Sequence, residues 1–164
     1  MKHPRLALSV AALLAAGFAA RPAPAQACGP LTFAFSTTGA GCAPGGGSIP
    51  VLTGSLQLIP GNPTCFTRLL LNTVDFLFPI PPTTLALGFS NPALPLPGLT
   101  GCTLWTSPIA FFSMSFDAGG VQFHDVIFPI PPSPSLIGTT AYAQAAVPVG
   151  GGFRISNGIQ IVIS

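Results

Sequence analysis

The residues of this sequence best suited to covalent chemistry are four cysteines, Cys28, Cys42, Cys65 and Cys102. In an exported chain an even number of cysteines indicates disulfides, and four cysteines allow three pairings. We favour bonds between sequence neighbours, Cys28 with Cys42 and Cys65 with Cys102. By loop-closure entropy each would contribute about 3–4 kcal/mol to stability. A metal site built from all four is the less favoured alternative, because no two cysteines have the close spacing of zinc ligands.

Acid–base catalysis would have to use His124, the only histidine after residue 27, together with an aspartate. Asp125 is adjacent to His124, so on a strand the two side chains point to opposite faces. Asp75 or Asp117 could approach His124 only through the tertiary fold. No G-x-S-x-G motif marks a nucleophilic serine. We therefore expect no enzyme, cofactor or metal, and we expect His124 to be a half-exposed strand residue.

Two aromatic residues, Trp105 and Tyr142, are weak candidates for ligand binding. Their rings could stack on a sugar, and each also carries a hydrogen-bonding group. The alternative is that both rings belong to the core or to an interface. A structural role is the more common one for such residues.

Residues 1–27 have the features of a cleaved export signal. Lys2 and Arg5 precede an apolar run at 6–20 that is too short to cross a bilayer as a stable helix. The small residues Ala25 and Ala27 are typical of a cleavage site, so Cys28 becomes the first residue. Lipidation of Cys28 is the alternative, and Ala25 disfavours it because a branched apolar residue is usual there. We expect one domain at 28–164 that is secreted or at the cell surface, with the periplasm also possible.

Loss of the signal changes the charge. Two arginines and three aspartates remain, so the formal net charge falls from +2 to −1. No basic patch survives for nucleic acid or anionic membranes, and no segment is expected to span a membrane. Five charged side chains are few for the surface of a soluble monomer. We therefore expect self-association or binding to another surface protein.

Short β-prone runs separated by proline and glycine clusters dominate the mature chain. Residues 51–59 alternate, with Leu52, Gly54, Leu56 and Leu58 on one face of the expected strand. No run shows sustained helical periodicity. The sequence predicts an all-β fold of about nine or ten short strands, packed as a two-sheet antiparallel β-sandwich after the cleaved N-terminal signal helix.

Two hairpins are expected. The first joins 109–117 to 121–130 through a glycine-containing turn at 117–120. The second joins 153–156 to 159–163 through Asn157-Gly158, the preferred pair for a two-residue turn. Residues 159–164 carry no charge, so we expect this segment to form a sheet edge open to pairing with another chain.

An internal repeat links two segments fifty residues apart. Asp75-Phe-Leu-Phe-Pro-Ile-Pro-Pro82 recurs as Asp125-Val-Ile-Phe-Pro-Ile-Pro-Pro132, and Gly88 corresponds to Gly138. A duplication giving two symmetric sites is one interpretation. We favour the other, in which proline ends ladder pairing at two similar strand exits.

An ordered set of motifs extends over the later part of the chain, at 87–98, 101–108, 129–138, 141–144 and 155–158. Over about 74–164 this order resembles an uncharacterised family of exported bacterial β-sandwich domains, abundant in planctomycetes. The resemblance implies export and the sandwich fold, and it brings no activity, ligand or functional residue. We expect a structural or interaction module. The alternative is a module that binds a polysaccharide or hydrophobic ligand through loops at one end of the sandwich.

Overall fold

The computed structural model describes residues 26–59, 64–72, 83–117 and 123–164. Outside these ranges lie residues 1–25 of the expected signal, the first copy of the repeat at 75–82 and residues 118–120 of the expected turn. The last two residues of the expected signal, Gln26 and Ala27, are described and pair with Phe33 and Thr32. The described chain consists of strands, loops and one short 3-10 helix, η1 (Pro134–Leu136). This confirms the all-β prediction. In the described ranges, no helix has the length and apolar character needed to cross a membrane.

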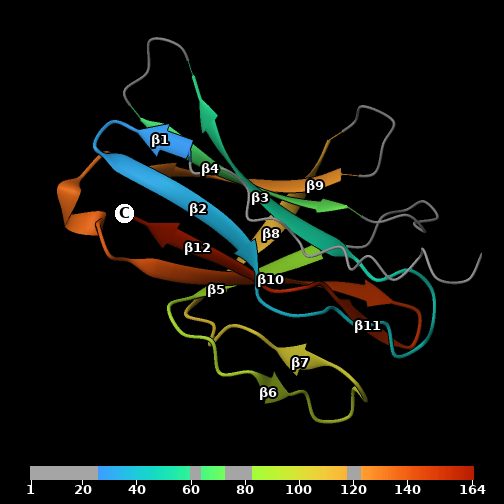
Figure 1. Ribbon diagram of the computed structural model, residues 1–164. Helices are drawn as coiled ribbons and strands as arrows, with labels where there is room; N and C mark the ends of the chain where they lie inside the picture. Colours follow the sequence, from blue (N-terminus) through green and yellow to red (C-terminus); the bar gives the residue numbers. More distant parts are fainter. Residues whose placement is uncertain (1–25, 60–63, 73–82, 118–122) are drawn as a thin grey trace, which may run out of the picture.

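The strands are short and follow one another closely along the chain (Figure 1). In order they are β1 (Gln26–Cys28), β2 (Leu31–Thr37), β3 (Val51–Leu58), β4 (Cys65–Asn72), β5 (Thr83–Gly88), β6 (Leu94–Pro95), β7 (Thr103–Leu104), β8 (Ala110–Asp117), β9 (Phe123–Ile130), β10 (Thr140–Val149), β11 (Gly152–Ile155) and β12 (Ile159–Ile163). Strands β3, β8 and β9 match the runs expected at 51–59, 109–117 and 121–130 to within a few residues. Strands β1 and β6 lie where no strand was expected, so the described residues form twelve strands where about nine or ten were predicted.

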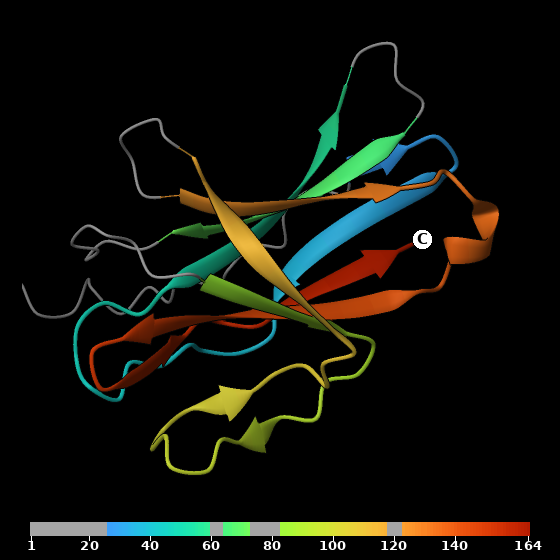
Figure 2. The same cartoon turned by 180° about the vertical axis from the view of Figure 1, so that it is seen from behind.

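The strands form two packed layers with antiparallel pairing throughout. The first sheet has the order β1-β2-β12-β10-β5-β8, with β11 beside β10, and the second has the order β8-β9-β4-β3. Strand β8 belongs to both, because Met114 pairs with Thr83 of β5 whereas Ser115 pairs with Asp125 of β9. Figure 2 shows β8 crossing from one layer to the other. The sandwich and the β8–β9 pairing are as predicted.

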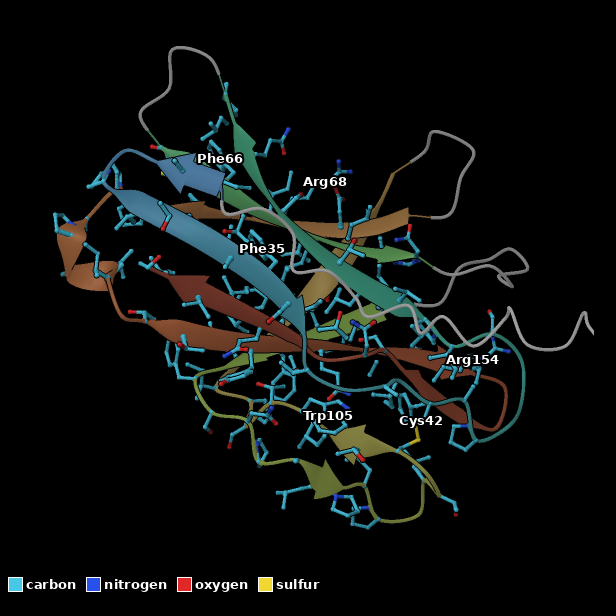
Figure 3. The ribbon with its side chains drawn as sticks, viewed as in Figure 1. Phe35, Cys42, Phe66, Arg68, Trp105 and Arg154 are labelled. Carbon is cyan, nitrogen blue, oxygen red and sulfur yellow. A yellow bond between two sulfur atoms is a disulfide. The ribbon has the colours of Figure 1, made fainter. Side chains whose placement is uncertain are left out.

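The core lies between the layers and follows the alternation of the strands. In β4, residues Cys65 to Leu71 alternate strictly between buried and half-buried. Phe35 of β2 points between the sheets (Figure 3), and its ring lies against Gly54 of β3. A Cβ at Gly54 would overlap that ring, so glycine permits the close approach. On the face predicted from the alternation of 51–59, Leu52 is fully buried and Leu58, at the strand end, is exposed.

The predicted hairpin at Asn157-Gly158 is wrong. Strands β11 and β12 do not pair with each other; both pair with the same side of β10. Ile155 is opposite Ala146 and Ile159 is opposite Ala143, so three residues on one strand face two on the other. The segment 156–158 is therefore a β-bulge, in which one extra residue bends the strand without reversing it.

The expected open edge at 159–164 is also wrong. Strand β12 lies in the middle of the first sheet, between β2 and β10 (Figure 1). Its three isoleucines are buried because they point into the core, and its backbone is paired on both sides. An uncharged β-prone sequence is typical of a central strand as well as of an unprotected edge.

The two glycines of the repeat have different roles. Gly138 has a φ of +86° in the loop after η1. Gly88 has no positive φ, and a Cβ there would overlap the backbone of Ser107, which passes over it. The two glycines are therefore not structurally equivalent, whereas the first copy of the motif, at 75–82, lies outside the described residues.

Candidate functional site

The disulfides connect Cys28 to Cys65 and Cys42 to Cys102. The pairing of sequence neighbours is therefore wrong, although all four cysteines are bonded. The sandwich brings β1 next to the start of β4, and it folds the segment that carries Cys102 back onto Cys42. The Cys28 thiol is buried in its disulfide, so it is not available for a thioether-linked lipid. Two disulfides indicate an oxidising compartment, extracellular or periplasmic.

The segment 89–109 leaves the first sheet, forms the small β6–β7 ladder and returns over the outer face of that sheet (Figure 1). Buried Gln144 of β10 holds it there through two hydrogen bonds and makes a third to Ser156. Its Oε1 accepts from the backbone N–H of Trp105 at 2.9 Å, and its Nε2 donates to the backbone oxygens of Thr103 and Ser156, both at 3.0 Å. Thr106 Oγ1 also donates to the backbone oxygen of Tyr142 at 3.2 Å. The position of Trp105 is therefore fixed by the sheet beneath it.

The Trp105 ring lies half-buried against two glycines. A Cβ at Gly39 or at Gly158 would overlap the Trp105 side chain, and Gly39 has a φ of +135° that favours glycine. The indole Nε1 donates to the backbone oxygen of Ala40 at 3.0 Å. Figure 3 shows Trp105 between the β6–β7 ladder and the sheet. Trp105 is thus anchored on one side, and part of its surface remains accessible.

Tyr142 lies on the same outer face as Trp105. Directly opposite it on β12 is Gln160, which in turn is opposite Ser36 on β2. Gln160 Nε2 donates to the Tyr142 hydroxyl at 3.3 Å, and Ser36 Oγ donates to Gln160 Oε1 at 3.3 Å. The structure therefore brings the two predicted aromatics onto one face and adds Gln160 and Ser36. Gln160 was missed because its strand was assigned to a sheet edge.

His124 is buried, with 2% of its surface exposed, so the expectation of a half-exposed residue is wrong. Its side chain points into the core because its register places it opposite the buried Leu71. Burial lowers the pKa of His124, and a hydrogen bond with the Met114 backbone acts in the opposite direction. Asp125 points to the outer face. The side chains of Asp75 and Asp117 lie outside the described residues.

The outer face of the second sheet carries an ion pair. Nε and Nη2 of Arg68 on β4 both lie 2.9 Å from Oδ2 of Asp125 on β9. The same face carries apolar residues around this pair, Phe66 and Leu70 on β4, Ile127 and Pro129 on β9, and Val51 on β3. On β3 it also carries the polar residues Thr53, Ser55 and Gln57, which lie opposite Leu70, Arg68 and Phe66. Ile127 and Val51 are each about half exposed, at 48% and 49%. Figure 3 shows Phe66 and Arg68 on this layer, far from Trp105.

Two separate faces therefore carry the side chains of interest. One is the Trp105 face, defined by Trp105, Tyr142, Gln160 and Ser36 on the first sheet. The other is the Arg68 face, defined by Arg68, Asp125, Phe66, Leu70 and Ile127 on the second. Comparison with known proteins finds no matching family model, no similar curated sequence and no similar solved structure.

Proposed function

We propose that the protein is a secreted or cell-surface structural module that works by self-association, and that it is not an enzyme. The observation that carries this proposal is the Arg68 face. It combines exposed apolar side chains with one positive and one negative charge placed side by side. A face of this kind is complementary to itself under a two-fold rotation, because Arg68 of one copy can lie against Asp125 of another.

The charge of the whole chain supports the same proposal. After residue 27 only five charged side chains remain, with a formal net charge of −1. Molecules with a net charge near zero repel one another weakly, which favours association. Arg68 and Asp125 are only partly buried, at 33% and 15% exposure, so a second copy can reach both groups.

Burial in an interface would strengthen the ion pairs. The Arg68–Asp125 pair contributes little to stability while water surrounds it. Covering Phe66, Leu70 and Ile127 removes apolar surface from water, at about 25 cal/mol per Å². The same apolar cover lowers the local dielectric around the charges and strengthens their attraction. The apolar residues thus provide affinity, and the charges fix the orientation of the two copies.

Sedimentation of the oxidised mature protein over a range of concentrations tests this proposal. We expect a concentration-dependent assembly that Ile127→Lys abolishes. The matched control is Ile137→Lys, since Ile137 is also half exposed, at 53%, but lies in the loop after β9. Arg68→Asp should weaken assembly by placing two carboxylates together, and the double exchange Arg68→Asp with Asp125→Arg should restore it. A protein that stays monomeric up to millimolar concentration would refute the proposal.

A further inference from the structure

We infer that the Trp105 face binds a neutral carbohydrate. This inference is independent of the proposed self-association, because it concerns the opposite sheet. Three of the four side chains come from the adjacent strands β2, β12 and β10. The fourth, Trp105, comes from the segment 89–109 that returns over the sheet. They are positioned by rigid strands and a disulfide-linked segment, which preorganises them for a ligand.

The polar part of the face is a row of hydrogen-bonding groups. Ser36, Gln160 and Tyr142 are directly opposite one another on adjacent strands and are joined by two hydrogen bonds. Neighbouring strands are about 4.8 Å apart, so the row extends over about 10 Å. Each of the three groups is half-buried and has hydrogen-bonding capacity beyond the contact it makes in the row. Such a row suits the adjacent hydroxyls of a sugar ring.

The aromatic part of the face is Trp105. It covers Gly158, which lies two residues before Gln160 on the same side of the β12 segment. Two residues of strand span about 7 Å, so the indole lies beside the middle of the polar row, displaced from Gln160 along the strand direction. Its Nε1 is already used by Ala40, which holds the ring in one orientation. A fixed aromatic ring beside planar amide and hydroxyl groups provides both the apolar and the polar contacts that a sugar offers.

The charge of the face selects the class of carbohydrate. None of its four residues is an aspartate, glutamate, lysine, arginine or histidine, and the described ion pair lies on the other sheet. An acidic sugar would lose the hydration of its carboxylate without gaining a cationic partner. The ligand class that fits is therefore a neutral polysaccharide.

Native affinity electrophoresis of the oxidised mature protein tests this inference. The probes are hydroxyethylcellulose, soluble starch, galactomannan and dextran, with polygalacturonate as the acidic comparison. We expect retardation by at least one neutral probe. Gln160→Ala should weaken the apparent affinity about five- to tenfold, since it removes the central amide. Trp105→Ala should weaken it by at least tenfold, with circular dichroism used to check that the variant folds.

The matched control is Gln57→Ala, which removes the same side chain from an exposed position on β3 of the other sheet. It should leave retardation unchanged, as should Ile127→Lys. The inference is overturned if no neutral probe retards the protein, if only polygalacturonate does, or if Gln57→Ala and Gln160→Ala have equal effects. Loss of assembly in Ile127→Lys with retained retardation would separate this site from the proposed self-association.

Discussion

The side-chain amide of Asn157 forms with the backbone of Leu52 the two hydrogen bonds that a neighbouring strand would form. Asn157 Oδ1 accepts from the Leu52 N–H at 2.7 Å, and Asn157 Nδ2 donates to the Leu52 oxygen at 3.0 Å. Both residues are buried. Asn157 belongs to the bulge in the first sheet and Leu52 to β3 of the second, so one side chain joins the two sheets.

Replacing Asn157 with alanine should lower the free energy of unfolding by about 2–4 kcal/mol, because it leaves a buried N–H and a buried C=O of Leu52 without partners. Urea unfolding followed by circular dichroism measures the change. Asn91→Ala is the control, since Asn91 is exposed and its side chain makes only a local contact with Ala93. A similar small effect for both substitutions would contradict the bridging role of Asn157.

Removing either disulfide should cost about 4 kcal/mol, because the bonds close loops with sequence separations of 37 and 60 residues. Replacing Cys42 and Cys102 with serine should also shift the Trp105 fluorescence to longer wavelength, since this bond holds the segment that carries Trp105. Replacing Cys28 and Cys65 should leave that emission unchanged in the folded protein. Peptide mapping that recovered a Cys28–Cys42 link would contradict the pairing.

Gly39→Ala should destabilise the fold by about 2–3 kcal/mol, because a side chain there is strained by the positive φ and displaces the Trp105 ring. Gly45→Ala is the matched control. A Cβ at Gly45 meets nothing within 4 Å, and Gly45 has no positive φ. Thermal unfolding compares the two variants, and equal melting temperatures would show that the ring does not rest on Gly39.

Stability should fall as the pH drops through the range below about 6.5, the ordinary pKa of histidine. Burial lowers the pKa of His124 in the folded protein, so the unfolded chain binds a proton first and gains stability relative to the fold. At pH 8 His124 is neutral in both the folded and the unfolded protein, so its protonation does not change the free energy of unfolding. Urea unfolding at pH 5 and pH 8 should show this loss in the wild type and a smaller one in His124→Leu. An equal loss in both proteins would assign the pH dependence to the carboxylates.

Sequence alternation was sufficient to locate most of the strands. The strand in 51–59 is recognisable because apolar residues recur at every second position. The β8–β9 pairing is recognisable because only a short connection separates the two strands. Local sequence is therefore sufficient to predict both. The fold class follows from the same signals. Local patterns also identified Trp105 and Tyr142 as residues that could bind a ligand, without indicating that they share a face.

The sequence predictions that proved wrong concern residues whose structural partners are distant in sequence. Asn157-Gly158 favours a turn locally, but the bonds from Asn157 to Leu52 hold it in a bulge. The pairing of the cysteines depends on which strands become neighbours, and the lengths of the intervening loops do not determine it. Gln160 and Ser36 are adjacent only because β12 lies between β2 and β10.

That position of β12 also constrains the order in which the protein folds. Strand β2 lies at 31–37, yet its partner on one side is β12 at 159–163, with Phe33 opposite Ile163. The first sheet cannot be completed until residues 159–163 have emerged, and long-range pairing of this kind makes folding slow. Until β12 pairs with both neighbours, β2 and β10 each present an unpaired edge, and an unpaired edge of this kind is prone to aggregation.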